Sequence, residues 1–352
     1  MGWHVGEADG GGGGGLTSSL FTALVVAGSA VLGFLGVCLG YVVISFALLW
    51  RAVPPPPFAS RVRIMSREFL LAALVQPLLP FFYLVGRKMA SGGGQPVVLV
   101  HGYSQNRADF LAIVWKFRRA GLGPLYGFNY PWMDTTARNV ERLARFIAAV
   151  RAETGKPSVD LIAHSMGGLV CLEYIADEAH KDRVRRCVTI ATPHAGVQWG
   201  GPILGAASRE IRATSVFLLE RRARVVGVPC LSIYSPTDNV VFPAETSALA
   251  LRGGTDKEAP AAGHFSILFE PEVIAEAAAF LAKPDIALTV EGTLGAANVS
   301  FEVGDEGGCA PNSTVQGAPE GCGRAGEDET LASACERGVD ELSGDDTRGR
   351  VG

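Results

Sequence analysis

The sequence lacks a metal-binding pattern, a disulfide framework and a basic stripe. Its seven cysteines are scattered over 352 residues in no spacing typical of zinc ligands, and their odd number does not suit a disulfide framework. Lysine and arginine form no nucleic-acid-binding motif, so we predict no nucleic-acid partner. The net charge of −4 arises at the C-terminal end, because residues 304–352 carry eleven Asp or Glu against four Arg.

Charge is absent altogether from residues 16–50. A helix of that length would measure about 52 Å, against about 30 Å for the hydrocarbon core of a bilayer, so one tilted or extended span fits and two do not. No Lys or Arg precedes the run, and it is too long for a signal peptide. We therefore predict a transmembrane anchor. Gly36 and Gly40 form a G-x-x-x-G pair against which a second helix could pack in self-association.

The linker at 51–94 leaves the topology open. Four arginines follow the anchor and none precedes it, which places this linker in the cytoplasm by the positive-inside rule. A second apolar run, from Phe69 to Gly86, contains two prolines and a glutamine. It either crosses the membrane as a second pass or lies at the interface or against the enzyme. The side on which the following domain lies depends on this choice.

Residues Val159–Val170, reading V-D-L-I-A-H-S-M-G-G-L-V, predict a strand, a sharp turn and a helix. Ser165 stands in the turn between the small residues Ala163 and Gly167, as in a nucleophile elbow, where a strained backbone exposes a serine hydroxyl. An ordinary helix N-cap is the alternative role for this serine. The segment A-H-S-M-G-G resembles the elbow of bacterial lipases of the α/β-hydrolase fold, in which Ala at the first small position is a known variant.

Strands and helices alternate on both sides of this elbow. Apolar segments predict strands at 96–100, 124–130, 186–191 and 229–234, and amphipathic or apolar segments predict helices around 140–150 and at 271–282. This alternation predicts an α/β class domain over 95–283 with a doubly wound, mostly parallel sheet. Residues 196–226 predict a short, lid-like insertion over an open pocket. Outside the domain we predict disorder at 1–15, a hairpin at 284–303 and a disordered acidic tail at 304–352.

In the α/β-hydrolase fold the nucleophile, the acid and the histidine follow one another along the chain in that order. His264 is the one histidine that follows the last predicted strands; the other five precede them. Asp238 lies in the loop after the strand that ends at Tyr234, with Asp256 as the alternative acid. Asp238 could instead simply close a turn after Pro236. We predict a triad of Ser165, Asp238 and His264.

Two backbone N–H groups are expected to stabilise the negative charge of a tetrahedral intermediate. Met166 follows the nucleophile at the positive end of its helix, and Tyr103 follows the His101-Gly102 pair at the end of an earlier strand. His101 and His164 are predicted to be hydrogen-bonded supports rather than bases. This chemistry needs neither a cofactor nor a metal ion, and we predict none.

Five motifs match, in order, segments of bacterial triacylglycerol lipases and related esterases: V-L-V-H-G-Y at 98–103, A-H-S-M-G-G at 163–168, A-T-P-H-A-G at 191–196, S-P-T-D-N-V-V at 235–241 and G-H-F at 263–265. The resemblance implies a carboxylic ester hydrolase that acts through an acyl-serine intermediate. The apolar anchor and the acidic tail depart from the pattern of secreted lipases. We predict a membrane-anchored serine hydrolase with an acyl ester or lipid substrate. A thioesterase or acyltransferase with the same triad, or a catalytically silent binding module, is the alternative.

Overall fold

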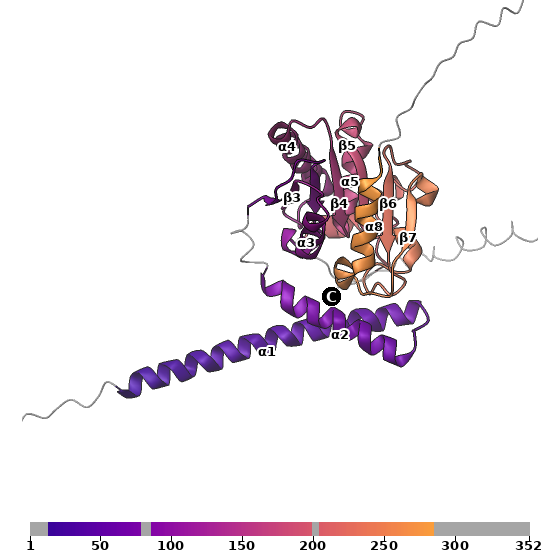
Figure 1. The fold of residues 1–352 in the computed structure, drawn as a ribbon. Coiled ribbons are helices and arrows are strands. Elements are labelled where there is room, and N and C mark those ends of the chain that lie inside the picture. Colours follow the sequence, from indigo (N-terminus) through magenta and orange to yellow (C-terminus); the bar gives the residue numbers. More distant parts are fainter. Residues whose placement is uncertain (1–12, 79–85, 199–203, 285–352) are drawn as a thin grey trace, which may run out of the picture. The chain divides into compact units, whose positions relative to one another are not determined.

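The computed structural model describes residues 13–78, 86–198 and 204–284, and Figure 1 shows their fold. The helices are α1 (Gly13–Ala52), α2 (Phe58–Val75), α3 (Leu111–Arg119), α4 (Thr136–Thr154), α5 (Met166–Ala176), α6 (Ala207–Glu210), α7 (Val216–Leu219) and α8 (Pro271–Ala282). The strands are β1 (Lys88–Ala90), β2 (Val97–Val100), β3 (Leu125–Phe128), β4 (Val159–His164), β5 (Val184–Ile190), β6 (Cys230–Tyr234) and β7 (Thr255–Glu258). Residues from 285 onward lie outside the described part of the chain, and the predicted hairpin (except residue 284) and the acidic tail lie there.

The seven strands form one sheet in the order β1-β3-β2-β4-β5-β6-β7. Strand β1 pairs antiparallel with β3, and all the other pairs are parallel. Every residue of β2, β3 and β4 is buried, as expected of strands covered on both faces. From β2 the chain moves to β3 on one side, and from β4 it moves to β5 on the other. The strand order therefore reverses between β2 and β4, and α/β sheets bind their ligands at such a point.

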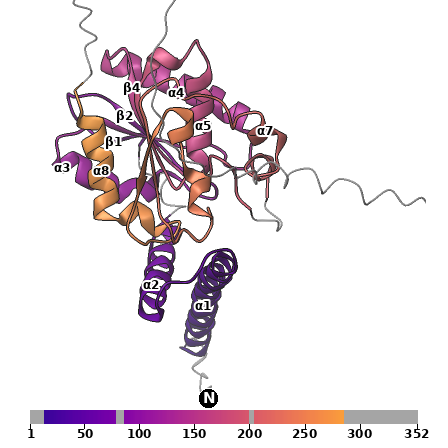
Figure 2. The same ribbon diagram turned by 90° about the vertical axis from the view of Figure 1, so that its right-hand side faces the viewer.

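Helices cover both faces of this sheet (Figures 1 and 2). Helices α4 and α5 pack on one face, where Leu143, Ile147 and Val150 of α4 join a cluster with the side chains of β4. Helices α3 and α8 pack on the other face, in a second cluster that includes Phe117 and Phe280. The predicted doubly wound α/β architecture is therefore confirmed.

Two edge strands and one helix escaped the sequence prediction. Strand β1 has only three residues, and β7 reads T-D-K-E, with Asp256 partly buried and its other side chains exposed. Short, polar edge strands carry no apolar pattern, because they cover little of the core. Helix α3 buries Ile113, Val114 and Phe117 against the sheet between basic residues, which is an amphipathic pattern that we did not assign.

Helix α1 changes its environment along its length. It begins at Gly13, inside the segment 1–15 for which we expected disorder, and residues 1–12 lie outside the described part. Most large apolar side chains between residues 20 and 37 are at least half exposed, namely Leu20, Phe21, Leu24, Val25, Val26, Val31, Leu32 and Val37, whereas Phe34 and Leu35 are partly buried. In its second half Val42, Phe46 and Leu49 are buried against α2 and Phe242. Within the described residues, α1 (19–52) is the single helix long and apolar enough to cross a membrane, by length and composition.

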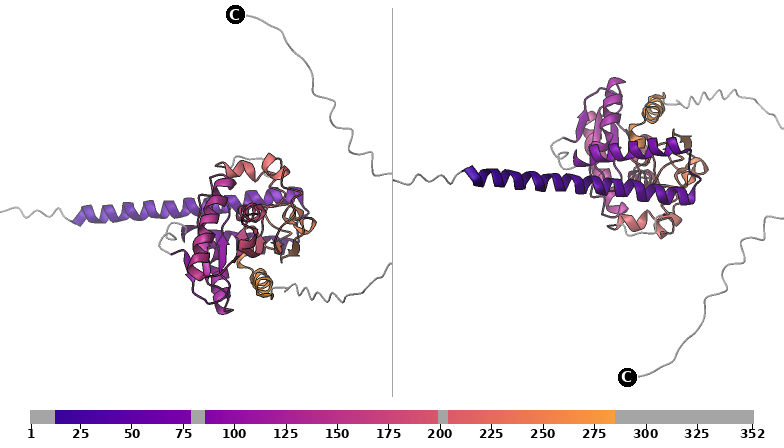
Figure 3. Two further views of the ribbon diagram at one scale, coloured as in Figure 1. Left: turned by 90° about the horizontal axis from the view of Figure 1, so that it is seen from above. Right: turned by 90° about the horizontal axis from the view of Figure 1, so that it is seen from below.

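Helix α2 packs beside α1 instead of continuing as a second apolar span, and Figure 3 follows the two helices from two directions. It buries Ile64, Glu68 and Ala72 and ends at Val75, part-way through the predicted second run. A 3-10 turn at 76–78 follows, where the first of the two prolines lies, and residues 79–85 lie outside the described part. Nothing within the described chain packs on Gly36 or Gly40, so self-association there stays a prediction.

The packing of α4 on the sheet predicts a large loss of stability for Leu143→Ala. The Leu143 side chain is fully buried, so its truncation should lower the free energy of unfolding by about 2–5 kcal/mol. Leu251→Ala is the matched control, because Leu251 is fully exposed, and it should change the free energy by less than about 0.5 kcal/mol. Urea unfolding of the full chain in detergent measures both, and equal losses would contradict the assigned core.

Candidate active site

Ser165 lies between the end of β4 and the start of α5 in a strained backbone conformation, with φ 53° and ψ −129°. A non-glycine residue with positive φ at a strand-to-helix turn is uncommon and is typical of functional sites. Gly167 makes the turn sterically accessible, since a Cβ atom there would lie 2.4 Å from the His101 carbonyl oxygen and 2.5 Å from that of Val100. The first turn of α5 thus lies directly against the end of β2.

His264 lies within hydrogen-bonding distance of both Ser165 and Asp238, the other two members of the predicted triad. The Ser165 Oγ lies 2.9 Å from His264 Nε2, and His264 Nδ1 lies 2.9 and 3.1 Å from the two oxygens of Asp238. Asp238 Oδ1 also accepts hydrogen bonds of 2.8 Å from the backbone N–H groups of Val240 and Val241. These donors hold the carboxylate in the orientation that meets the imidazole.

The electrostatics around His264 favour the protonated imidazole. Burial lowers the pKa of His264, but the charge of Asp238, its hydrogen bond and the charge of Glu68 together outweigh burial and raise the pKa above its usual value. An imidazole with this environment is a strong acceptor for the Ser165 proton.

Asp256, the alternative acid, has another role. Its carboxylate accepts hydrogen bonds from the backbone N–H groups of Leu249 and Ala250, at 2.7 and 3.1 Å. The Asp238 carboxylate thus meets the imidazole, whereas the Asp256 carboxylate holds the chain that leads to β7.

The predicted oxyanion donors belong to Met166, which follows Ser165, and to Tyr103, which follows Gly102; a Cβ atom on Gly102 would lie 2.8 Å from that of Ser165. Met166 is the first residue of α5, where backbone N–H groups point out of the helix. The N–H of Gly102 already donates to Gln105 Oε1 at 2.8 Å. The next N–H along that loop, that of Tyr103, is therefore the one that we predict for the oxyanion. The Tyr103 hydroxyl both donates to the Leu204 carbonyl and accepts from the Leu204 N–H, so the Tyr103 side chain ties this loop to the lid-like segment.

His101 and His164 are fully buried beside the site and are hydrogen-bonded, in keeping with supporting roles. The Nδ1 of His101 donates to the Gly102 carbonyl, and its Nε2 accepts from the Tyr130 N–H. The ring nitrogens of His164 lie 2.8 Å from Gln105 Oε1 and 3.0 Å from the His264 carbonyl oxygen. Burial lowers the pKa of His101 to about 4 and that of His164 well below its usual value.

Sequence reasoning missed Glu68 and Asn239. Glu68 lies on α2, within the segment that we treated as a linker, and its carboxylate reaches the backbone beside His264. Asn239 adjoins the acid and accepts a hydrogen bond from the His264 N–H at 2.8 Å. An acidic residue in a segment otherwise rich in Arg and apolar residues was the available signal for Glu68.

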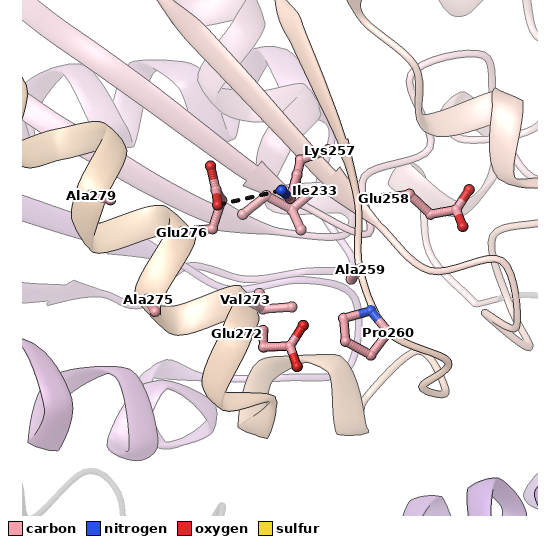
Figure 4. Close-up of a pocket in the computed structure, with 10 residues that line it drawn as sticks. All are labelled: Ile233, Lys257, Glu258, Ala259, Pro260, Glu272, Val273, Ala275, Glu276 and Ala279. Atoms are coloured by element: carbon pink, nitrogen blue, oxygen red, sulfur yellow. Dashed lines mark ion pairs between the residues drawn. The ribbon is translucent and has the colours of Figure 1, made fainter.

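The surface cavity in Figure 4 lies apart from this site. It has a volume of about 340 Å³ and is formed by α8 and the chain around β6 and β7. An ion pair of 3.7 Å between Lys257 and Glu276 lies across it. None of Ser165, Asp238 and His264 lines it, so we do not assign the substrate to this cavity.

A protein-family model matches part of this chain. The family model described as the alpha/beta hydrolase fold matches residues 95–204. The fold is that of the α/β hydrolases. The matched segment of this α/β-hydrolase domain runs from β2 through the elbow and β5 to the lid-like segment.

Solved structures of similar fold include lipases and an esterase. Lipase B of Aspergillus fumigatus is 19% identical with a TM-score of 0.47, and the match covers 54% of this chain and about half, 53%, of that one. Mature lipase BlEst2 of Bacillus licheniformis is 16% identical, with coverage of 51% and 88% and a TM-score of 0.43. Carboxylesterase CesB of Bacillus subtilis is 16% identical, with coverage of 55% and 86% and a TM-score of 0.39.

The buried, neutral His101 predicts a loss of stability in mild acid. The folded chain holds this imidazole neutral down to about pH 4, whereas the unfolded chain protonates it near pH 6.5. Its contribution is therefore complete above pH 6.5 and is lost as the pH falls toward 4. Thermal unfolding should show a shallower pH dependence over this range for His101→Asn, which keeps an amide nitrogen near the position of Nδ1. An unchanged slope in the variant would count against this assignment.

Proposed function

We propose that the chain is a membrane-anchored serine hydrolase that cleaves carboxylic esters, with acyl lipids as the substrate class. The observation that carries this proposal is the hydrogen-bonded series Ser165 Oγ, His264 and Asp238, built on a strained turn. The α/β-hydrolase fold supports it, because this fold presents such a series at the carboxyl edge of its sheet.

The geometry suits acyl transfer to Ser165. His264 Nε2 accepts the hydroxyl proton as Oγ attacks the ester carbonyl, and Asp238 stabilises the imidazolium that forms. The N–H groups of Met166 and Tyr103 stabilise the oxyanion, and His264 then protonates the leaving alcohol. A water molecule activated by His264 releases the acid from the acyl-serine. Each step uses side chains and backbone groups of this chain.

The first half of α1 is the membrane-embedded segment in this proposal. Its exposed apolar side chains run from Leu20 to Val37, a length of about 27 Å, close to the thickness of the hydrocarbon core of about 30 Å. One face of the following part, with Val42, Phe46 and Leu49, packs against protein, which accounts for a helix longer than the bilayer needs. The active site is thereby held near a lipid surface, where acyl esters are abundant.

The contacts of α2 favour a cytoplasmic active site. Glu68 is bound to the backbone of the α/β-hydrolase domain, and Arg67 forms an ion pair with Glu270. A helix docked on the domain in this way does not cross the bilayer, so the domain stays on the side of the four arginines at 51–67. That side is the cytoplasm.

Covalent labelling tests the proposed nucleophile. A fluorophosphonate should label the wild-type chain and leave Ser165→Ala unlabelled. Asp238→Asn should label with a rate lower by about 10³- to 10⁴-fold, because the imidazole loses the partner that sets its tautomer. Asp256→Asn is the matched control and should label at nearly the wild-type rate. A folded wild-type chain that resists the probe would sink the enzyme proposal and favour a catalytically silent binding module.

Translation into sealed microsomes tests the topology. The chain carries natural glycosylation acceptors, Asn298 and Asn312, after the α/β-hydrolase domain. A cytoplasmic domain predicts that both stay unmodified, whereas an acceptor placed on a spacer before Met1 is glycosylated in the lumen. Glycosylation of Asn298 or Asn312 would place the active site on the opposite side.

A further inference from the structure

A buried carboxylate outside the proposed triad contacts the loop that carries His264. The side chain of Glu68 on α2 is 0% exposed. Its Oε1 accepts hydrogen bonds from the Phe265 N–H at 2.9 Å and from the Tyr41 hydroxyl at 3.1 Å, and its Oε2 accepts from the Ser266 N–H at 2.8 Å. The charge of Glu68 is thus met by three uncharged donors.

A second side chain extends this network to the acid loop and to α1. Asn239 Oδ1 accepts the N–H of His264, and Asn239 Nδ2 donates to Ser45 Oγ at 2.7 Å and to the Tyr41 hydroxyl at 3.2 Å. Three consecutive N–H groups, those of residues 264–266, therefore end on Glu68 or Asn239. Both helices of the α1–α2 pair contribute to holding them.

The loop is shaped to admit the Glu68 carboxylate. A Cβ atom on Gly263 would lie 2.4 Å from Glu68 Oε2 and 2.9 Å from Asn239 Oδ1, closer than carbon and oxygen can approach. Glycine at this position lets the backbone pass directly against both side chains. Any other residue would push the His264 loop away from α2.

Energetics argue against simple packing as the reason for this residue. Burying an ionised carboxylate is costly, and an apolar side chain of similar volume often stabilises such a position as well or better. The donors that repay this cost belong chiefly to the two residues that follow His264. The Glu68 carboxylate therefore fixes the position of the His264 loop, which an apolar side chain could not do.

We propose that Glu68 is a positioning residue for His264, and that the α1–α2 pair is part of the active-site scaffold as well as the membrane attachment. This inference rests on the proposed serine hydrolase function. It makes the anchor and the catalytic loop one structural unit, since Tyr41 and Ser45 of α1 belong to the same network.

The charge of Glu68 gives this role a distinctive signature. Three titratable groups face His264: Asp238 from the loop after β6, Glu68 from α2, and His164, whose ring centroid lies 4.8 Å away. Asp238 and Glu68 favour the imidazolium, whereas His164, with its lowered pKa, stays neutral. Removal of the Glu68 charge should therefore move the protonation of His264 to lower pH.

The test compares Glu68→Gln and Glu68→Asp with wild type, as full chains in detergent, on p-nitrophenyl butyrate. For Glu68→Gln we expect kcat to fall on the order of 10- to 100-fold with little change in KM, because the loop shifts without loss of a substrate contact. The acidic limb of kcat/KM should move to lower pH. Glu68→Asp, which keeps the charge, should recover part of the activity and the wild-type limb.

Arg67→Ala is the matched control, because it removes the adjacent contacts of α2 with Glu270 and Phe269 without touching the His264 loop. It should retain kcat within about twofold. A Glu68→Gln enzyme with wild-type kcat and an unmoved acidic limb would overturn the positioning role. A fall in activity that a lower melting temperature explains, with no recovery in Glu68→Asp, would also overturn the positioning role.

The two proposals fail in different ways. If Ser165→Ala abolishes fluorophosphonate labelling while Glu68→Gln labels at the wild-type rate, the enzyme stands and the positioning role falls. If the folded wild-type chain neither labels nor hydrolyses the ester, the serine hydrolase function falls, and the positioning role falls with it.

Discussion

The four hydrogen-bonding groups of His264 join its loop to two segments of the chain, residues 164–165 at the end of β4 and residues 238–239 after β6. Its Nε2 meets Ser165, its Nδ1 meets Asp238, its N–H donates to Asn239 and its carbonyl oxygen lies against His164. The strand ends that carry these partners share one edge of a parallel sheet, which is why they can converge. The loop that carries His264 has no regular structure across this edge, so its position depends on these contacts and on Glu68.

This dependence connects the site to helices α1 and α2. A loop held by hydrogen bonds in a buried environment is precise only while each partner is present, because an unpaired buried polar group is costly. Two of the elements that supply partners are α1 and α2, which precede the domain matched by the family model. The boundary between the proposed anchor and the α/β-hydrolase domain, clear in composition, is therefore absent in the hydrogen-bond network. A truncated domain that begins near residue 95 would lack Tyr41, Ser45 and Glu68.

Much of the fold could be predicted because burial imposes a visible pattern. Strand β2 is a continuous apolar run, β4 is apolar except at Asp160 and His164, and α8 begins and ends where its apolar segment does. The same rule explains the misses, since β1 and β7 lie at the edges, where little apolar surface is covered. Of the site, the order of serine, acid and histidine along the chain sufficed to select His264. The choice between Asp238 and Asp256 rested on loop position alone.

By itself, the sequence determined the α/β class, the elbow at Ser165 and a helix able to cross a bilayer, because local periodicity, a short motif and the absence of charge each act over a few neighbouring residues. Only the tertiary structure decided which face of the C-terminal part of α1 is buried, where α2 lies, and which backbone groups Glu68 binds. Glu68 and Phe265 are separated by almost two hundred residues. Their contact depends on the packing of two helices against the domain, and no local pattern encodes that packing.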